Sequence, residues 1–252
     1  MSRNIRMVLQ YDGTRYDGWQ KQGNTDNTIQ GKLEQVLTRM TGRETEVHGS
    51  GRTDAGVHAA GQVVNAHLET PLSEQEIKAY VNQYLPEDIL VLEVSEADSR
   101  FHSRLNAIEK IYTYRLDMAE KVSVFERKYR YAVGGKLDVN AMERAGRLLC
   151  GTHDFKSFCS GRTGKKSTVR TLYEISFAVD GTKADIQYRG NGFLYNMVRI
   201  LTGTLIEVGQ GKRDADSMPE ILEKRDRQMA GFTAPAKGLC LTEVRYPAAL
   251  GK

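Results

Sequence analysis

Residues 49–58 read GSGRTDAGVH, a short stretch that places three glycines around one arginine and one aspartate. Glycine allows positive φ and close approach by another segment, so this density predicts a shaped loop rather than a linker. Arg52 is near enough in sequence to keep the Asp54 carboxylate ionised where water is excluded. Because an ionised, desolvated carboxylate can act as a nucleophile or a base, Asp54 is a candidate catalytic residue. A turn in which its side chain bonds the nearby backbone is the structural alternative.

The elements around this loop follow the order β-α-β-β-α-β. Alternating and helical periodicities predict strands over residues 5–11, 45–48, 62–68 and 89–94 and helices over residues 29–40 and 74–84. Asn27 with Gln30, and Ser73 with Glu76, have the spacing of capping boxes. This order is the split βαβ, or ferredoxin-like, pattern.

The same order recurs in the second half of the chain. The pattern there predicts strands over residues 107–118, 129–133, 172–179, 184–189 and 239–246 and helices over residues 139–149, 193–208 and 217–225. Asp138 is the expected cap of the first of these helices, and Ser217 with Glu220 has the spacing of a third capping box. Asp180-Gly181 is a typical hairpin turn.

The recurring element order favours two α/β units, residues 1–105 and 106–252. The fold class is therefore α/β (α+β), two ferredoxin-like units. If their sheets join edge to edge, they form an extended, mainly antiparallel sheet with helices on one side and a basic cleft.

Composition favours a globular protein with a polyanionic partner. Hydrophobic residues make up 40% of the 252, charged residues 27%, and the net charge is +4. Residues 100–130 hold eight Lys or Arg against four acids, with aromatic residues interleaved. This basic middle suits nucleic acid; a solvated face is the alternative. No run approaches the length of a membrane span and the N-terminus has no signal-peptide pattern, so we expect a cytoplasmic protein without a membrane partner.

Metal and nucleotide motifs are poorly matched. Residues 161–167, GRTGKKS, have too few residues between the glycines for a P-loop. A basic loop that binds the phosphodiester backbone is the better interpretation, and a plain surface loop is the alternative. His48 and His58 lack a matched set of further ligands, and the three cysteines form no CxxC pair. We therefore expect no metal and no cofactor.

Several motifs together resemble the tRNA pseudouridine synthase A family. They follow one another in order over nearly the whole chain and are residues 11–20, 28–30, 51–58, 101–104, 110–114, 151–158, 170–171, 192–199 and 234–239. The resemblance is strongest in GRTDAGVH at residues 51–58.

The resemblance implies a reaction and a set of roles. Such enzymes isomerise uridine to pseudouridine in the anticodon stem-loop of tRNA, at positions 38, 39 and 40, as homodimers and without cofactor or metal. Asp54 matches the essential aspartate, which attacks the sugar, attacks the base or abstracts a sugar proton. Tyr112 matches a tyrosine that stacks on the target uracil, and Arg199 an arginine paired to the aspartate. Arg52 matches an arginine that helps displace the nucleotide, and Leu239 an apolar residue of the base pocket.

Two other functions remain as alternatives. The first is a catalytically silent RNA-binding protein on the same fold, against which the intact set of Asp54, Tyr112 and Arg199 argues. The second is a nucleotide-hydrolysing enzyme built on residues 161–167, which the failed P-loop spacing disfavours.

Overall fold

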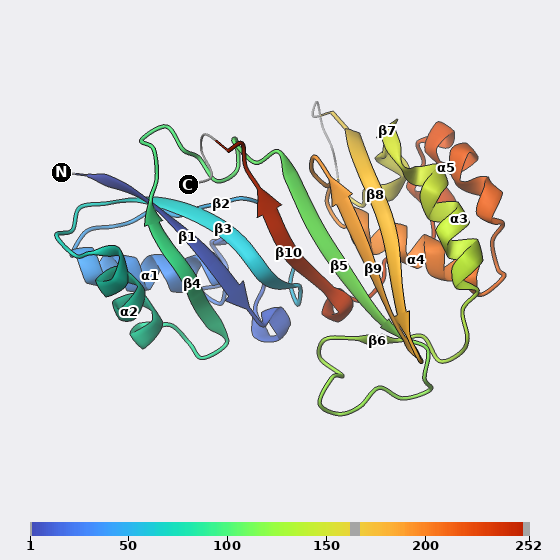
Figure 1. Cartoon of the computed structure of the whole chain (residues 1–252), viewed down its shortest axis with the longest axis horizontal. Coiled ribbons are helices and arrows are strands. Elements are labelled where there is room, and N and C mark those ends of the chain that lie inside the picture. Colours follow the sequence, from blue (N-terminus) through green and yellow to red (C-terminus); the bar gives the residue numbers. More distant parts are fainter. Residues whose placement is uncertain (1, 162–166, 249–252) are drawn as a thin grey trace. The chain divides into compact units, whose positions relative to one another are not determined.

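The computed structural model describes residues 2–161 and 167–248. The chain folds into two compact units (Figure 1). Unit 1 contains the residues up to Ile108 together with those from Cys240 on, and unit 2 contains Glu109–Leu239. The sequence pattern predicts a boundary at residues 105 and 106 and places the last strand in the second unit. The strand β10 (Leu239–Arg245) instead pairs in parallel with β3 (His58–Leu68) of unit 1, which is why the residues from Cys240 on belong there.

Unit 1 has the predicted β-α-β-β-α-β order. Its elements are β1 (Arg3–Tyr11), α1 (Ile29–Thr41), β2 (His48–Gly49), β3, α2 (Glu74–Tyr84) and β4 (Ile89–Glu96), with a 3-10 turn at Gly13–Arg15. Strand β1 lies between β4 and β3 and is antiparallel to both, and β2 pairs antiparallel with β3. The mixed α/β class with mainly antiparallel pairing is thus confirmed.

Local caps explain where the helices of unit 1 begin. The capping box at α2 is confirmed: Ser73 Oγ accepts from the Glu76 N–H at 3.3 Å, and Glu76 Oε2 accepts from the Ser73 N–H at 2.8 Å. At α1 the predicted cap is wrong. Thr28, not Asn27, accepts from the Gly31 N–H at 3.2 Å, because the Asn27 amide is used to donate to the Arg15 carbonyl.

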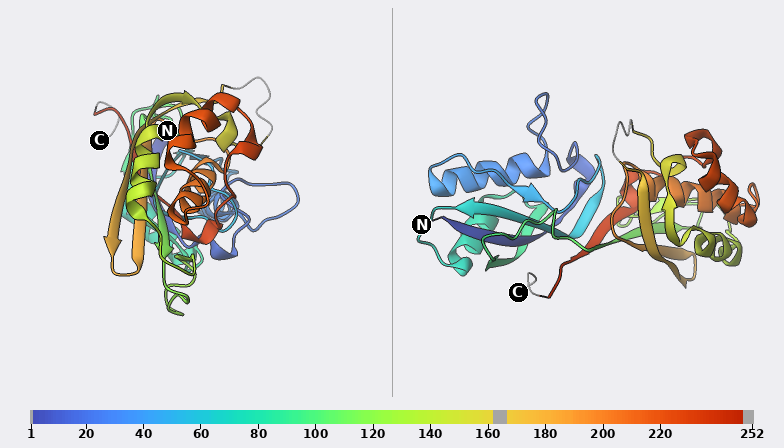
Figure 2. Two further views of the ribbon diagram at one scale, coloured as in Figure 1. Left: turned by 90° about the vertical axis from the view of Figure 1, so that its right-hand side faces the viewer. Right: turned by 90° about the horizontal axis from the view of Figure 1, so that it is seen from above.

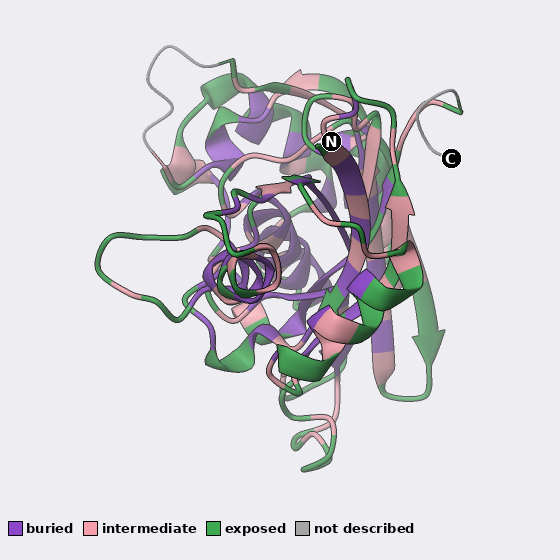
Figure 3. Ribbon diagram, turned by 90° about the vertical axis from the view of Figure 1, so that its left-hand side faces the viewer, coloured by how far each residue is buried: buried purple, intermediate pink, exposed green. Residues whose placement is uncertain are grey.

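The core of unit 1 follows from the alternation along β1. Ile5, Met7 and Leu9 are fully buried, and Tyr11 at the end of the strand is 3% exposed. Buried residues run through the strands and helices, whereas many of the connecting loops are exposed (Figure 3). Helices α1 and α2 contact each other, and α2 contacts β4. Trp19, in the loop between β1 and α1, is also buried. The end of β1 and the loop after it are therefore fixed by the core.

Unit 2 repeats an antiparallel sheet with the order β5-β9-β8-β7. Its elements are β5 (Glu109–Asp117), β6 (Tyr131–Ala132), α3 (Val139–Leu149), β7 (Gly151–Asp154), β8 (Val169–Asp180), β9 (Lys183–Gly190), α4 (Met197–Gly209) and α5 (Met218–Lys224). Short 3-10 turns lie at Lys156–Phe158, Ala215–Ser217, Arg227–Met229 and Ala236–Gly238. Helix α3 contacts α4 and β8 (Figure 2).

Most elements of unit 2 were predictable, with three differences. The hairpin β8–β9 and the Asp138 cap of α3 are confirmed. Strand β7 is not foreseen by the pattern, and α4 begins at Met197 rather than at residue 193. Ser217 makes no capping hydrogen bond, because a 3-10 turn capped by Asp214 already places it in helical conformation. Among the described residues, no helix is long and apolar enough to cross a membrane.

Candidate active site

The residue before Asp54 is held on both its backbone and its side chain. The Thr53 carbonyl accepts from the Trp19 N–H at 3.0 Å, and Thr53 Oγ1 lies 2.8 Å from the Tyr11 hydroxyl in a buried pair. Burial raises the pKa of the Tyr11 phenol well above its ordinary value, so the hydroxyl stays neutral. The start of the Asp54 turn is thereby anchored to the end of β1.

A buried glutamine holds the beginning of the loop. Gln62 Nε2 donates to the Gly51 carbonyl at 2.9 Å, and its Oε1 accepts from Ser50 Oγ at 2.5 Å. The Ser50 N–H donates to the Val63 carbonyl at 2.8 Å. Because Gln62 is fully buried on β3, the loop backbone is fixed to the centre of the sheet of unit 1.

Close packing explains the glycines. A Cβ on Gly13 would lie 1.9 Å from the Val57 carbonyl oxygen, and a Cβ on Gly49 would lie 2.6 Å from the Trp19 ring. Gly56 has a φ of 76° in the turn that the Val57 N–H closes onto the Asp54 carbonyl at 3.1 Å. The predicted shaped loop is confirmed, and Asp54, half-buried, occupies the first position of its turn.

A second polar group lies where this loop meets β3. The Gly13 N–H donates to Nδ1 of the buried His58 at 3.1 Å, and Asp12 Oδ1 is 3.2 Å from the same nitrogen. The backbone of the loop after β1 and a carboxylate therefore both lie against the first residue of β3. Within the described residues, no group of three or more His, Cys, Asp or Glu side chains is placed to hold a metal ion.

Arg52 does not act as the charge partner that its position in sequence predicts. In residues 2–161 and 167–248, its exposed side chain makes no hydrogen bond or ion pair. The role of Arg52 in displacing the nucleotide stays a prediction.

Tyr112 and Arg199 both belong to unit 2. Tyr112 on β5 is opposite Tyr188 of β9, is 7% exposed, and meets the Phe193 ring edge to face at a centroid distance of 5.1 Å. Arg199, in the first turn of α4, donates from Nε to the Ala234 carbonyl at 2.7 Å and from Nη1 to Asn196 Oδ1 at 2.9 Å. The guanidinium is thus held in one orientation from two sides.

Leu239 follows the segment that holds Arg199. It is buried, with 5% of its surface exposed, and comes directly after the 3-10 turn Ala236–Gly238. The Tyr114 hydroxyl donates to the Pro235 carbonyl at 2.7 Å. Burial raises the pKa of Tyr114 well above its ordinary value, and the charge of Arg199 opposes that rise. Tyr112, Arg199 and Leu239 are therefore constituents of one unit, whereas Asp54 and Arg52 belong to the other.

Sequence reasoning missed the residues that position the candidates. Tyr11, Thr53 and Gln62 hold the Asp54 loop, and Asn196 and Ala234 hold Arg199. A signal was present for Tyr11, Thr53, Asn196 and Ala234, since all four lie within motifs of the family resemblance. None was present for Gln62, which lies outside those motifs.

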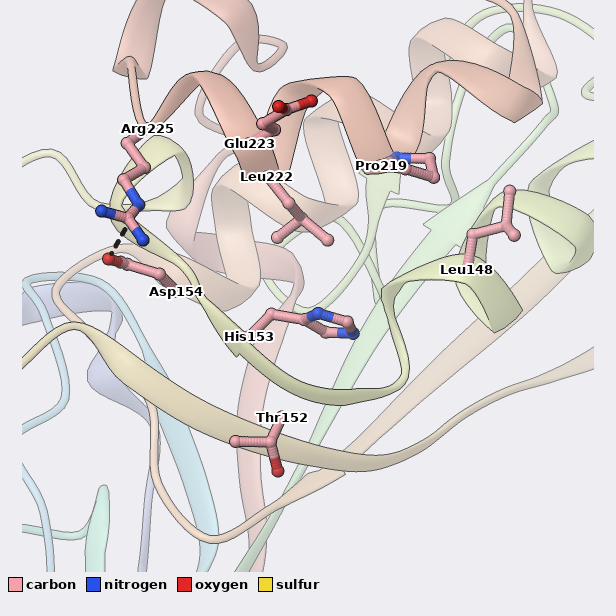
Figure 4. Close-up of a pocket in the computed structure, with 8 residues that line it drawn as sticks. All are labelled: Leu148, Thr152, His153, Asp154, Pro219, Leu222, Glu223 and Arg225. Atoms are coloured by element: carbon pink, nitrogen blue, oxygen red, sulfur yellow. Dashed lines mark ion pairs between the residues drawn. The ribbon is translucent and has the colours of Figure 1, made fainter.

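A groove on the surface of unit 2 contains none of the candidate residues (Figure 4). Its lining residues are Leu148, Thr152, His153, Asp154, Pro219, Leu222, Glu223 and Arg225. Arg225 Nε lies 3.3 Å from Asp154 Oδ2, and His153 Nε2 lies 3.0 Å from the Cys150 carbonyl oxygen. The basic loop expected at residues 161–167 lies largely outside the described residues, which omit 162–166.

Comparisons with known proteins agree on one family. A family model described as tRNA pseudouridine synthase matches residues 7–106 and 145–247. A protein named tRNA pseudouridine synthase A 2 from Bacillus cereus is 46% identical over 243 residues, covering 96% of this chain and 99% of its own. A tRNA pseudouridine synthase A from a Geobacillus species is 47% identical, covering 98% of this chain and 99% of its own. The chain belongs to the tRNA pseudouridine synthase family.

Solved structures resemble the chain less closely. A chain of the archaeal box H/ACA Nop10–Cbf5 complex aligns with 81% of this chain and 44% of its own, with 12% identity and a TM-score of 0.39.

Proposed function

We propose that this chain isomerises uridine to pseudouridine in tRNA. The observation that carries the proposal is family membership over nearly the full length, with relatives of about the same length named for this activity. The reaction breaks the bond between N1 of uracil and C1′ of the sugar, turns the base, and joins C5 to C1′; the proton lost from C5 is balanced by one gained at N1. The product is an isomer of the substrate, so no other reactant is consumed.

The proposed substrate site is the anticodon stem-loop, at positions 38, 39 and 40. A base within a stem is inaccessible to a catalytic group, so the uridine has to leave the stack, at a cost of a few kcal/mol. Stacking on an aromatic ring recovers roughly 1–3 kcal/mol, the role we propose for Tyr112. Leu239 is the proposed apolar wall of the base pocket, and Arg52 assists displacement of the nucleotide.

Asp54 is the proposed catalytic residue, and Arg199 its proposed charge partner. The support for Asp54 is its position: a half-buried carboxylate on a turn that directly follows a segment held at Thr53 and, through Gln62, at Ser50 and Gly51. A catalytic group held in this way is already oriented when substrate binds. The exposed guanidinium of Arg52, two residues away, is suited to a phosphate.

The proposed partners are tRNA and a second copy of the chain, in the cytoplasm. Backbone phosphates supply affinity that does not depend on sequence, and the Lys and Arg residues of 100–130 are the proposed source of that affinity. The homodimer is proposed from the family resemblance.

The test is an assay of the purified protein on an unmodified tRNA transcript, with pseudouridine mapped by position. We expect product at one or more of positions 38, 39 and 40. Asp54→Ala should lower the single-turnover rate by at least about a thousandfold, while tRNA affinity measured by filter binding stays within about twofold. Asp26→Ala, which removes an exposed acid from a loop of the same unit, is the matched control and should retain full activity.

Two outcomes would contradict the proposal. Pseudouridine formation by Asp54→Ala at the wild-type rate would remove Asp54 from the chemistry. Tight binding of tRNA by the wild-type protein with no pseudouridine at any position would favour the alternative, a catalytically silent RNA-binding protein.

A further inference from the structure

The turn that precedes α4 has an unusual backbone for its residue type. The Met197 N–H donates to the Leu194 carbonyl at 3.1 Å, which makes Asn196 the third residue of a tight turn. Asn196 has φ 58° and ψ 7°, the left-handed conformation that the third position of a type II turn requires. Among the described residues, Asn196 and Arg225 are the non-glycine positions with positive φ. Glycine fits such a position without strain, so the asparagine side chain calls for a separate explanation.

Both polar atoms of the Asn196 side-chain amide form hydrogen bonds. Its Oδ1 accepts from Arg199 Nη1 at 2.9 Å, and its Nδ2 donates to Ser160 Oγ at 2.7 Å. An arginine can only donate, whereas a serine hydroxyl can donate or accept, so Arg199 decides which way the amide faces. The Ser160 N–H also donates to the Tyr195 carbonyl at 3.4 Å. The turn and the segment around Ser160 therefore hold the amide oxygen toward Arg199.

Both residues that orient Arg199 through these contacts offer neutral acceptors. Besides Asn196 Oδ1, the Ala234 carbonyl accepts from Arg199 Nε at 2.7 Å, and the Ala234 N–H donates back to the Arg199 carbonyl at 3.0 Å. Neutral acceptors fix the plane of a guanidinium without neutralising its charge. A carboxylate at the same place would form a stronger, charge-assisted bond and would take up that charge.

We infer that Asn196 is a positioning residue for the reaction: it holds the Arg199 guanidinium in its working orientation while leaving its positive charge for the reacting groups. The inference rests on the proposed function, in which Arg199 pairs with the catalytic aspartate. Asparagine meets three demands at once, since it tolerates the left-handed conformation, presents an acceptor to Arg199, and carries no charge.

Two substitutions separate positioning from a structural role. Asn196→Gly keeps the backbone conformation and removes the acceptor. Asn196→Asp keeps the acceptor and tolerates the conformation, but adds a negative charge beside Arg199. If the role is positioning, each lowers the single-turnover rate of pseudouridine formation by about tenfold or more, with tRNA affinity within about twofold and a melting temperature close to wild type.

A purely structural Asn196 gives a different pattern. Asn196→Asp would then retain the wild-type rate, since its bond to Arg199 is the stronger one. That result, or a wild-type rate in Asn196→Gly, overturns the inference. Should Asn196→Gly fail to fold, Asn196→Asp still decides, because it keeps the contact that holds the turn.

A double-mutant cycle tests whether Asn196 acts through Arg199. In an Arg199→Ala background, Asn196→Gly should cause no further loss of rate; an equal loss in both backgrounds overturns the inference. Arg225→Gly is the matched control, because it also removes a side chain from a left-handed position, and it should leave the single-turnover rate at saturating enzyme unchanged.

The inference and the proposed function fail in distinguishable ways. A wild-type protein that forms no pseudouridine contradicts the proposed function. A wild-type protein that forms it, with Asn196→Gly and Asn196→Asp equally active, contradicts only the role of Asn196.

Discussion

The Asp54 loop of unit 1 and the Arg199 turn of unit 2 hold their charged groups in different ways. The loop is fixed mainly through its backbone and the side chains that flank Asp54, by Tyr11, Trp19 and Gln62. At the turn, the Arg199 guanidinium itself donates hydrogen bonds to the Asn196 amide and the Ala234 carbonyl.

The difference follows from the shapes of the two side chains. Aspartate has a short side chain, so fixing its backbone also fixes its carboxylate. Arginine has a long, flexible side chain with high rotamer entropy. Its guanidinium is therefore fixed only if it makes hydrogen bonds itself. Three pairs of substitutions extend the comparison between the two units, in order of decreasing expected effect.

The largest effects are expected where a glycine touches a carbonyl oxygen. An added Cβ would lie 1.9 Å from the Val57 oxygen at Gly13 in unit 1, and 1.8 Å from the Phe232 oxygen at Gly203 in unit 2. Gly13→Ala and Gly203→Ala should each lower the free energy of unfolding by about 3 kcal/mol or more, measured by urea denaturation. For Gly203 the overlap outweighs the gain of about 1 kcal/mol that alanine brings to a helix.

Control glycines lie in open space in both units. Gly23→Ala and Gly135→Ala place a Cβ with no heavy atom within 4 Å and should change the unfolding free energy by less than about 0.5 kcal/mol. A stable Gly13→Ala protein would show that the contact between the Gly13 and Val57 segments is looser than described.

A smaller effect is expected from two buried phenols. The Tyr11 hydroxyl bonds Thr53 Oγ1 in unit 1, and the Tyr188 hydroxyl bonds Thr202 Oγ1 in unit 2, both at 2.8 Å. Tyr11→Phe leaves Thr53 without this partner and should cost about 1–3 kcal/mol. Tyr188→Phe should cost about 1 kcal/mol, since Thr202 keeps its bond to the Val198 carbonyl.

The two phenols should also differ in their effect on activity. Tyr11→Phe loosens the residue beside Asp54 and should lower the single-turnover rate several-fold, whereas Tyr188→Phe should leave it unchanged. Equal rates in the two variants, measured at a temperature where both are folded, would show that the Thr53 anchor does not position Asp54.

The smallest effect concerns two of the three capping-box sequences, one in each unit. Hydrogen bonds from Ser73 lower the pKa of Glu76 below its ordinary value of 4.5. A carboxylate with a depressed folded-state pKa stabilises the fold above 4.5, and that stability is lost as the pH falls through the folded-state value. Glu76→Gln should therefore flatten the decline of the urea midpoint below pH 4.5. Glu220→Gln, at the same spacing in unit 2 but without a capping box, is the matched control substitution.

Local patterns predicted most of the element order. The alternation of β1, the capping box of α2, the Asp138 cap and the β8–β9 hairpin all depend on residues a few positions apart. Where a prediction from a local pattern was wrong, the residue makes a different contact instead. Asn27 donates to the Arg15 carbonyl, and Ser217 is already part of a 3-10 turn.

The sequence by itself determined the α/β class, the glycine-rich loop with Asp54, and the family, which the comparisons confirm. Only the tertiary structure decided what holds the charged groups. Tyr11 reaches Thr53 across 42 positions, and Ala234 reaches Arg199 across 35. It also decided that β10 pairs with β3, far earlier in the chain. The physical reason is that caps and periodicities act within one or two turns of backbone, whereas a buried hydroxyl or carbonyl takes whichever partner the packing of distant segments brings to it.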